Sequence, residues 1–212
     1  ITYNERNLLG NGCYERTDDG LSRFGLAAVE EMNRLGILID LSHVGDRTTL
    51  DTIEHSSCPV AITHANARSQ IDHPRNKTDE AIKLLVERGG VIGANAFPMF
   101  FNRGFETELD EYLEAIDYLV QMVGIDNVAV GTDFCMEQPR SFFEWLFMSQ
   151  GKVAAPEVAY TPEPYHHLRG FESPADWIKV AHGLLERNYS ETDAKKVLGE
   201  NWLRLFGEVW SK

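Results

Sequence analysis

The chain has 212 residues, of which 43% are hydrophobic, enough to bury the core of one or two domains. Its 33 acidic residues outnumber 20 basic ones, and the formal net charge of −13 argues against nucleic acid or an anionic lipid surface as a partner. No segment approaches the roughly 20 apolar residues of a membrane span. The three cysteines form no C-x-x-C pair, as is typical of a reducing compartment, so we place the protein in the cytoplasm.

Helical and strand patterns alternate through the first two thirds of the chain. Apolar residues at helical spacing, each time followed by a short apolar run, predict helix–strand pairs at 24–35 and 37–43, 46–56 and 59–64, 78–89 and 91–97, and 108–123 and 127–133. The apolar runs are continuous rather than alternating, which is typical of strands buried on both faces of a parallel sheet. We therefore expect an α/β fold, with residues 1–212 in a single domain.

The rest of the chain breaks this rhythm. Residues 135–174 are rich in aromatic side chains and proline and contain a histidine doublet, so we expect a lid, a subunit contact or a wall of the site there. Two helices are predicted to follow, over 174–187 and 190–210. Four parallel strands are too few for an eight-stranded barrel, and as an open sheet they would expose two long edges. Because the chain begins with Ile1 rather than Met, we expect a processed or truncated product, the second part of a larger fold.

Two histidines stand at the carboxyl ends of successive predicted strands. His43 ends the run 37–43, and His64 ends the run 59–64. Because the carboxyl ends of parallel strands meet at the functional edge of an α/β fold, the two imidazoles can hold one metal ion. Neutral imidazole nitrogens suit zinc and similar divalent cations. Either histidine alone would more often be structural, but the pair favours a metal or catalytic site.

Other candidate side chains fall near the same edge. Asp133 ends the last predicted strand and can ligate a metal, hold an ammonium group or transfer a proton, although a carboxylate there can also only cap a turn. Arg75 follows the strand that carries His64, where a guanidinium can clamp a substrate carboxylate, although a bare arginine is more often a surface residue. Asp40 lies within a predicted strand and can orient a neighbouring ligand. The histidine doublet at 166–167 can add a further ligand.

Several short stretches, spread over most of the chain, carry a family resemblance. They are Ile1–Asn4, Gly20–Gly25, Glu31–Gly36, Ile39–His43, Thr63–Ala65, Arg75–Asn76, Gly89–Val91 and Gly131–Phe134. In this order they resemble the membrane (renal) dipeptidase family of zinc metallopeptidases. The resemblance implies zinc-dependent hydrolysis of dipeptides by a metal-dependent (β/α)8 TIM barrel, of which this chain contains only the carboxyl-terminal strands and helices.

The same resemblance implies a role for each candidate residue. His43 and His64 would ligate the second of two zinc ions (Zn2+). Arg75 would bind the terminal carboxylate of the dipeptide, and Asp133 would contact the substrate and transfer a proton. Tyr3 falls where some family members carry a histidine that contacts the substrate.

The sequence departs from the family pattern in its remaining metal ligands. Family members hold the first zinc with an H-x-D motif on the first strand and bridge both ions with a glutamate. No H-x-D occurs in this sequence, and none of its glutamates is assigned to the bridge, so we expect the chain as given to be inactive. Motifs of serine hydrolases, P-loops and dinucleotide-binding folds are also absent.

Two other functions stay open at this point. One is another barrel metal hydrolase, of the lactonase, deaminase or phosphotriesterase type, because such enzymes share strand-end histidines. The other is a half-barrel without catalytic activity that acts as a structural or metal-binding partner of another chain. The oligomeric state is also open, a homodimer included.

Overall fold

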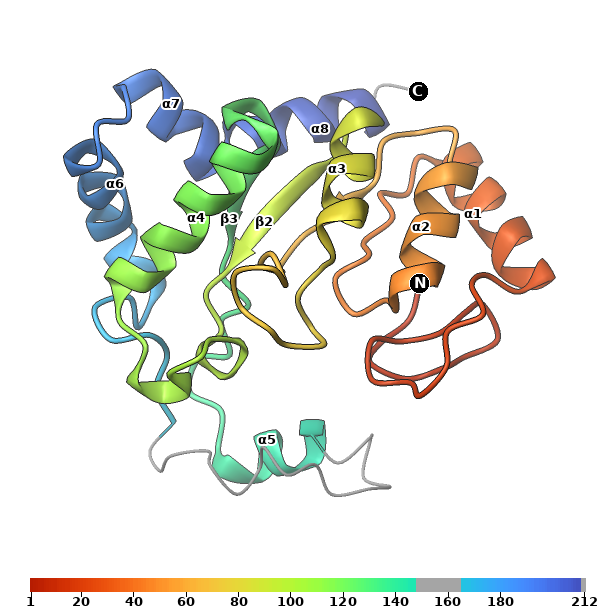
Figure 1. Cartoon of the computed structure of the whole chain (residues 1–212), viewed down its shortest axis with the longest axis horizontal. Helices are drawn as coiled ribbons and strands as arrows, with labels where there is room; N and C mark the ends of the chain where they lie inside the picture. The colour runs from red at the N-terminus through yellow and green to blue at the C-terminus, as the bar shows by residue number, and fades with distance from the viewer. Residues whose placement is uncertain (148–164, 211–212) are drawn as a thin grey trace.

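Three short parallel strands form the centre of the fold (Figure 1). In this computed structural model, which describes residues 1–147 and 165–210, the strands are β1 (Ala61–Ile62), β2 (Val91–Asn95) and β3 (Val128–Gly131). They are ordered β1-β2-β3, and both neighbouring pairs are parallel. The predicted parallel α/β sheet is confirmed, although each strand is shorter than its apolar run.

A helix precedes each of these strands, as the alternating pattern predicts. The helices are α2 (Asp46–His55) before β1, α3 (Asp79–Glu87) before β2 and α4 (Leu109–Val123) before β3, while α1 (Arg23–Leu35) comes earlier. The side chains of Ser22 and Thr78 accept backbone N–H groups at the starts of α1 and α3, so these helices begin where the capping residues place them.

The predicted strand 37–43 forms a single parallel bridge, between Asp40 and Ala61. Two backbone hydrogen bonds of 2.9 Å flank this bridge. The pairing stops there because the Oδ1 atom of Asp40 accepts the backbone N–H of Ser42 at 3.1 Å, which turns the chain. A full strand over 37–43 is therefore wrong, and His43 lies in the turn that follows Asp40.

The segment after β3 contains α5 (Arg140–Phe147), which the sequence did not predict. The lid, subunit contact or site wall expected over 135–174 falls partly on residues 148–164, outside the described residues. Short 3₁₀ turns occur at Pro98–Phe100, Gly104–Glu106, Ile125–Asn127 and Pro174–Asp176. No helix in the described ranges is long and apolar enough to span a membrane.

Three further helices end the described chain. They are α6 (Trp177–Glu186), α7 (Glu191–Lys195) and α8 (Asn201–Trp210). The single helix predicted over 190–210 is wrong, because a π-helical turn with a break at Gly199 separates α7 from α8. The side chain of Asn201 then donates to the carbonyls of Ile125 at 2.8 Å and Val128 at 2.7 Å. These bonds hold the start of α8 against the start of β3, so α8 does not continue in line with α7.

Apolar side chains fill both sides of the sheet. On one side, strand residues join the main core, which includes Ile62, Ile92, Val128 and Val130 together with residues of α1 to α4 and α6. On the other side, a second cluster contains Ala61, Val91, Ala129, Leu205 and Val209. Its last two members belong to α8, which Figure 1 shows lying across the end of the sheet where β2 and β3 begin. The opposite end, where the strands stop, is left for the site.

The sheet is strongly curled. A Cβ atom at Gly131 would lie 2.0 Å from the carbonyl oxygen of Thr63, and one at Gly93 would lie 2.1 Å from the same oxygen. Only glycine allows backbones to approach this closely. The curl brings the ends of β1 and β3 together although β2 separates them.

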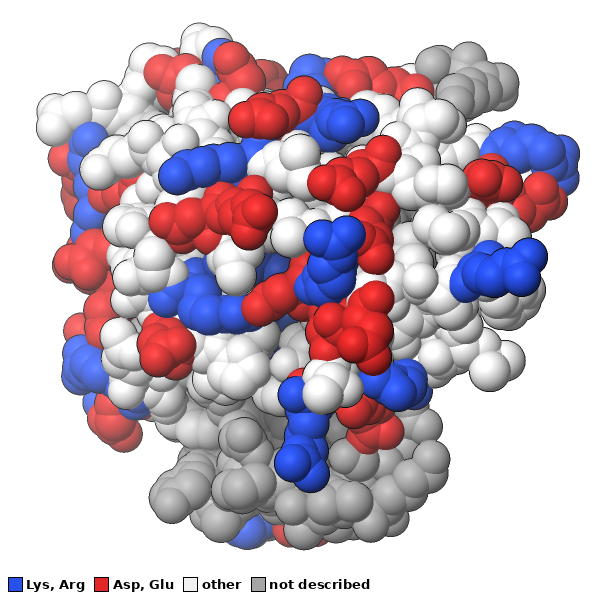
Figure 2. All heavy atoms as spheres, turned by 45° about the vertical axis from the view of Figure 1, so that its right-hand side comes forward, with Lys and Arg blue, Asp and Glu red and all other residues white. Residues whose placement is uncertain are grey.

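Charged side chains of both signs cover the surface. Figure 2 shows acidic and basic residues intermixed over the face in view rather than gathered by sign. Several of them form ion pairs between described residues, including Arg34 with Glu31 and Arg47 with Asp51, each at 2.6 Å. Exposed pairs of this kind contribute about 0 to 1 kcal/mol each, so they add little to the stability of the fold.

One lysine is completely buried in the loop that leads to the site. Lys77 is 0% exposed, and its Nζ donates to the carbonyl of Val44 at 2.5 Å and contacts Thr49 Oγ1 at 3.4 Å. Burial, with the nearby Arg75 charge, lowers the pKa of Lys77 to about 7. An unfolded lysine has a pKa of about 10.4, so unfolding at neutral or higher pH takes up a proton.

The free energy of unfolding should therefore rise with pH in a way that depends on Lys77. Between pH 7 and 9 the unfolded state binds the proton that the folded state lacks, so the wild-type protein should gain about 1 kcal/mol for each pH unit relative to Lys77→Met. Urea unfolding of both proteins at several pH values measures this difference. Lys83→Met, at an exposed position, is the control and should run parallel to the wild type. Parallel curves for Lys77→Met and the wild type would show that Lys77 is charged in the fold.

Candidate active site

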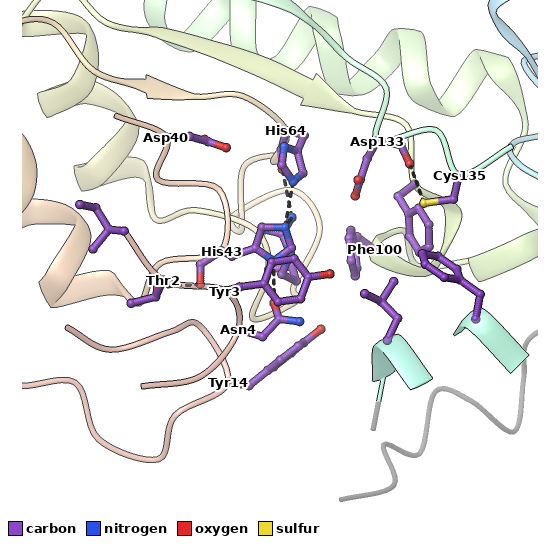
Figure 3. Close-up of a pocket in the computed structure, with 15 residues that line it drawn as sticks. Thr2, Tyr3, Asn4, Tyr14, Asp40, His43, His64, Phe100, Asp133 and Cys135 are labelled. Carbon is purple, nitrogen blue, oxygen red and sulfur yellow. Dashed lines mark hydrogen bonds between the residues drawn. The ribbon is translucent and has the colours of Figure 1, made fainter. Parts of the chain in front are cut away.

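Four of the side chains singled out from the sequence lie around one cavity at the carboxyl edge of the sheet. His43, His64, Arg75 and Asp133 line this cavity of about 420 Å³ (Figure 3). They come from the turn after Asp40, the end of β1, the loop before α3 and the end of β3. Parallel strands and the curl of the sheet bring them together, while their chemical roles stay predictions.

The orientation of His64 is set by a short chain of hydrogen bonds. Its Nδ1 lies 2.7 Å from Thr63 Oγ1, and that hydroxyl donates to Asp40 Oδ2 at 2.7 Å. A threonine has one hydroxyl proton, so Thr63 accepts from His64 and the imidazole carries its proton on Nδ1. The Nε2 atom of His64 is therefore bare.

His43 is held in the same tautomer by a different partner. Its Nδ1 lies 2.7 Å from Asn4 Oδ1, an oxygen that can only accept a hydrogen bond. Nδ1 is therefore the protonated nitrogen, and Nε2 is bare. The ring of Tyr3 stacks on His43, with 4.1 Å between centroids and 25° between planes. Two neighbouring residues of the amino-terminal segment thus fix one imidazole.

The unprotonated Nε2 atoms of the two histidines face each other. His43 Nε2 and His64 Nε2 lie 3.0 Å apart (Figure 3), and lone pairs at this distance repel unless a proton or a cation lies between them. His43 Nε2 also accepts a long hydrogen bond from Arg75 Nη2, at 3.4 Å. Burial is the largest cause that lowers the pKa of both imidazoles, and the Arg75 charge lowers the pKa of each further, so a proton is disfavoured. The donor set fits a divalent cation bound through two Nε2 atoms. Within the described residues no group of three or more His, Cys, Asp and Glu could hold a metal.

Asp40 connects both histidine segments. Its carboxylate accepts the backbone N–H and the hydroxyl of Ser42, at 3.1 and 2.6 Å, and the backbone N–H and hydroxyl of Thr63, at 3.0 and 2.7 Å. Burial alone would raise the pKa of Asp40, but His64 and these hydrogen bonds outweigh it and lower that pKa. The structure thus places Asp40 where it orients a candidate ligand, as the sequence suggested.

Arg75 is buried rather than on the surface. It is 1% exposed, and its Nη1 and Nη2 donate to the carbonyls of Ser42 and His64. The guanidinium lies over the ring of Phe100, 4.9 Å from the centroid. Its Nε atom has no hydrogen-bond partner among the described residues. A buried cation at a cavity wall is suited to an anionic group of a ligand.

The backbone of Asp133 adopts an uncommon conformation. Its φ of 53° lies in the left-handed region, which costs a residue with a side chain roughly 1 to 2 kcal/mol. The turn directs the carboxylate into the cavity, on the side opposite Tyr3 and His43 (Figure 3). Asp133 also acts electrostatically on this group, because its charge raises the pKa of His64. The uncommon backbone conformation of Asp133 thus directs its carboxylate toward the histidine pair.

Two residues near the pair come from the amino-terminal segment. Burial, and to a lesser extent the Asp133 charge, raises the pKa of Tyr3 to about 12, so its hydroxyl stays protonated and can donate into the cavity. Asn4, which holds His43, was missed from the sequence. Asn4 lies 39 residues before His43 in the chain, so no local sequence pattern links the two residues. The φ of Asn4 is 60°, a left-handed conformation that asparagine tolerates.

The histidine doublet does not join the pair. His167 is 2% exposed, and its Nε2 accepts the backbone N–H of Cys135 at 3.0 Å. His166 Nδ1 lies 2.9 Å from the carbonyl oxygen of His167. Neither residue is among those that line the cavity, so the structure gives no support to the doublet as a source of a further metal ligand.

Three known proteins are similar to this chain. An amidohydrolase from Pseudomonas aeruginosa has a crystal structure similar to all of this chain, with 39% identity and a TM-score of 0.91, and the match covers 64% of that protein. An uncharacterized dipeptidase of Schizosaccharomyces pombe is 34% identical over 119 residues, 55% of this chain and 29% of that protein. A metallopeptidase from Rhodobacter sphaeroides, solved with a phosphinate mimic of the dipeptide L-Ala-D-Ala, is 24% identical with a TM-score of 0.78 over 99% of this chain and 54% of its own.

The chain thus spans about two thirds or less of these longer relatives. The sequence model of the membrane dipeptidase family, peptidase family M19, matches residues 1–144, which include all four candidate side chains. This match confirms the resemblance inferred from the sequence. The chain belongs to the membrane dipeptidase family of peptidases.

Proposed function

We propose that this chain supplies part of the active site of a zinc-dependent dipeptidase built on a (β/α)8 barrel. The observation that carries the proposal is the histidine pair, whose bare Nε2 atoms face each other at 3.0 Å in a cavity shared with Arg75 and Asp133. Family membership supports peptide hydrolysis as the reaction class. The curl of the parallel sheet supports the barrel, because three strands with this curvature form an arc rather than a flat layer.

His43 and His64 would hold one zinc ion through their Nε2 atoms. Because the described residues offer no third ligand and the chain covers 64% of the Pseudomonas relative, we propose that barrel segments found in the longer relatives complete the set and hold a second zinc ion. Zinc bound there supplies a Lewis acid and an activated water near neutral pH. Asp40, Thr63 and Asn4 keep both imidazoles in the tautomer that binds metal.

The remaining side chains would bind and process the substrate. Arg75 would pair with the free carboxylate of a dipeptide, which explains why a charged group that is 1% exposed is kept at the cavity wall. Asp133 would move a proton between the attacking water and the amine that leaves. The Tyr3 hydroxyl stays protonated and would donate to the substrate carbonyl region. A substrate longer than a dipeptide would place no carboxylate at Arg75.

A broader hydrolase activity is the second candidate. The structure that is 39% identical to this chain carries the name amidohydrolase, and barrel lactonases, deaminases and phosphotriesterases also use histidines at strand ends. These reactions do not require a carboxylate clamp. The buried Arg75 at the cavity wall therefore favours the dipeptidase over these alternatives.

Zinc binding should depend on the facing imidazoles. His64→Ala leaves His43 without its partner, so we expect zinc affinity, measured by calorimetric titration of the metal-free full-length protein, to fall by about tenfold or more. Thr63→Val keeps the imidazole but removes the acceptor of its Nδ1 proton, and should cost about 10- to 100-fold. His182→Ala, on the exposed face of α6, is the control. Equal affinities in all four proteins would place the metal elsewhere.

Substrate choice should depend on Arg75. We expect the zinc-loaded full-length protein to hydrolyse a dipeptide in preference to the same dipeptide with an amidated carboxyl end, a lactone and a phosphotriester. Arg75→Met should raise KM for the free dipeptide by about 100-fold or more and leave the amide unchanged, because only the former loses an ion pair. Arg75→Lys keeps the positive charge but cannot bind a carboxylate through two parallel hydrogen bonds, so its KM should lie between those of the wild type and Arg75→Met.

Two outcomes would contradict this account. A lactone or phosphotriester turned over faster than the dipeptide would favour the broader hydrolase. An Arg75→Met protein that still prefers the free carboxylate would remove Arg75 from the substrate site. Circular dichroism of each variant separates these results from loss of fold.

A further inference from the structure

The turn that carries Asp133 is tied to a distant buried histidine. The backbone N–H of Cys135, two residues after Asp133, donates to His167 Nε2 at 3.0 Å. We propose that His167 is a positioning residue for Asp133, because this bond holds the turn that directs the carboxylate into the cavity. The inference rests on the proposed function of Asp133 in the dipeptidase reaction.

The turn needs such an anchor. The pairing of β3 with β2 ends at Gly131, so the sheet itself does not hold Asp133. The φ of Asp133 is 53°, in the left-handed region, which is uncommon for residues with a side chain although aspartate and asparagine adopt it more readily than the others. The turn has two other contacts: the Cys135 thiol lies 3.7 Å from the Asp133 carbonyl, which is a weak hydrogen bond, and the ring of Phe134 packs against Phe171 at 5.0 Å between centroids. The bond to His167 therefore restrains the backbone of the turn directly, while Phe134 holds it through its side chain.

His167 is itself rigidly placed. It is 2% exposed, and the ring of Phe134 meets it edge-on at 4.6 Å between centroids. The backbone beside it is fixed to the start of α4, since Arg169 N–H donates to Thr107 O at 3.0 Å and Leu109 N–H donates to Arg169 O at 2.9 Å. His167 thus connects the turn at the end of β3 to the start of α4.

The protonation of His167 agrees with this role. Because Nε2 accepts the Cys135 N–H, the ring proton is on Nδ1, which lies 3.4 Å from the hydroxyl of Tyr165. Burial lowers the pKa of His167 to about 4, so the ring stays neutral and keeps its acceptor near neutral pH. His167 does not line the cavity, which separates it from the residues that would contact metal or substrate.

Two variants of His167 test this proposal, because one keeps an aromatic ring and the other keeps a hydrogen-bond acceptor. His167→Phe keeps an aromatic ring but removes the acceptor, while His167→Gln places an amide oxygen near the position of Nε2. His182→Phe, on the exposed face of α6, is the matched control. In the zinc-loaded full-length protein we measure amide exchange of Cys135 by NMR, zinc affinity, and kcat and KM for a dipeptide.

We expect His167→Phe to speed exchange of the Cys135 amide by about tenfold or more and to lower kcat by a similar factor, with zinc affinity unchanged. His167→Gln should recover most of both losses, whereas a merely structural loss would not be recovered by the smaller side chain. Unchanged exchange in His167→Phe would overturn the proposal, as would faster exchange with an unchanged kcat.

Two further observations keep the result decisive. If the wild-type protein hydrolyses no dipeptide, the proposed function fails, and amide exchange still decides whether His167 holds the turn. If His167→Phe does not fold, the bond is tested in the wild type by the ¹⁵N–¹⁵N coupling between the Cys135 amide and His167 Nε2. A measurable coupling supports the anchor, and its absence contradicts it.

Discussion

The arrangement of the site depends on the carboxylate of Asp40. This group accepts four hydrogen bonds from Ser42 and Thr63, so it ends the extended segment before His43 and fixes the end of β1 before His64. Because Asp40 takes the only hydroxyl proton of Thr63, it also decides which nitrogen of His64 is protonated. One partly buried carboxylate therefore sets both the position of the two segments and the protonated nitrogen of an imidazole.

The site combines features that cost stability elsewhere in proteins. Two bare nitrogens face each other at 3.0 Å, a guanidinium is 1% exposed, and Asp133 has a left-handed backbone. Each feature is held by rigid neighbours, because the surrounding segments are fixed by backbone pairing and by buried side chains. A metal ion between the imidazoles and an anion at Arg75 would relieve the first two costs, so binding and stability are coupled in this account.

Much of the site could be predicted from the sequence because parallel strands place their carboxyl ends at one edge. That rule brings His43, His64 and Asp133 together whatever the exact strand lengths. The rule does not predict contacts between distant segments, such as those of Asn4 with His43 or of His167 with Cys135, since no local pattern encodes them.

The fold, like the site, could be predicted only in part from the sequence. The alternation of helix and strand follows from apolar periodicity, and the structure confirms it. The shortened strand at 37–43 and the break before α8 follow instead from side-chain hydrogen bonds, those of Asp40 to Ser42 and of Asn201 to the start of β3. Periodicity carries no information on such bonds, because they depend on where the chain returns in space.

The central claim is that His43 and His64 bind one metal ion through Nε2 while their Nδ1 atoms stay protonated. Loading the full-length protein with ¹¹³Cd and measuring ¹⁵N–¹¹³Cd couplings of the two rings tests it most directly. The account predicts a coupling to Nε2 of both histidines, with Nδ1 protons protected from exchange by Thr63 and Asn4. Coupling through Nδ1, or to fewer than both rings, would contradict it.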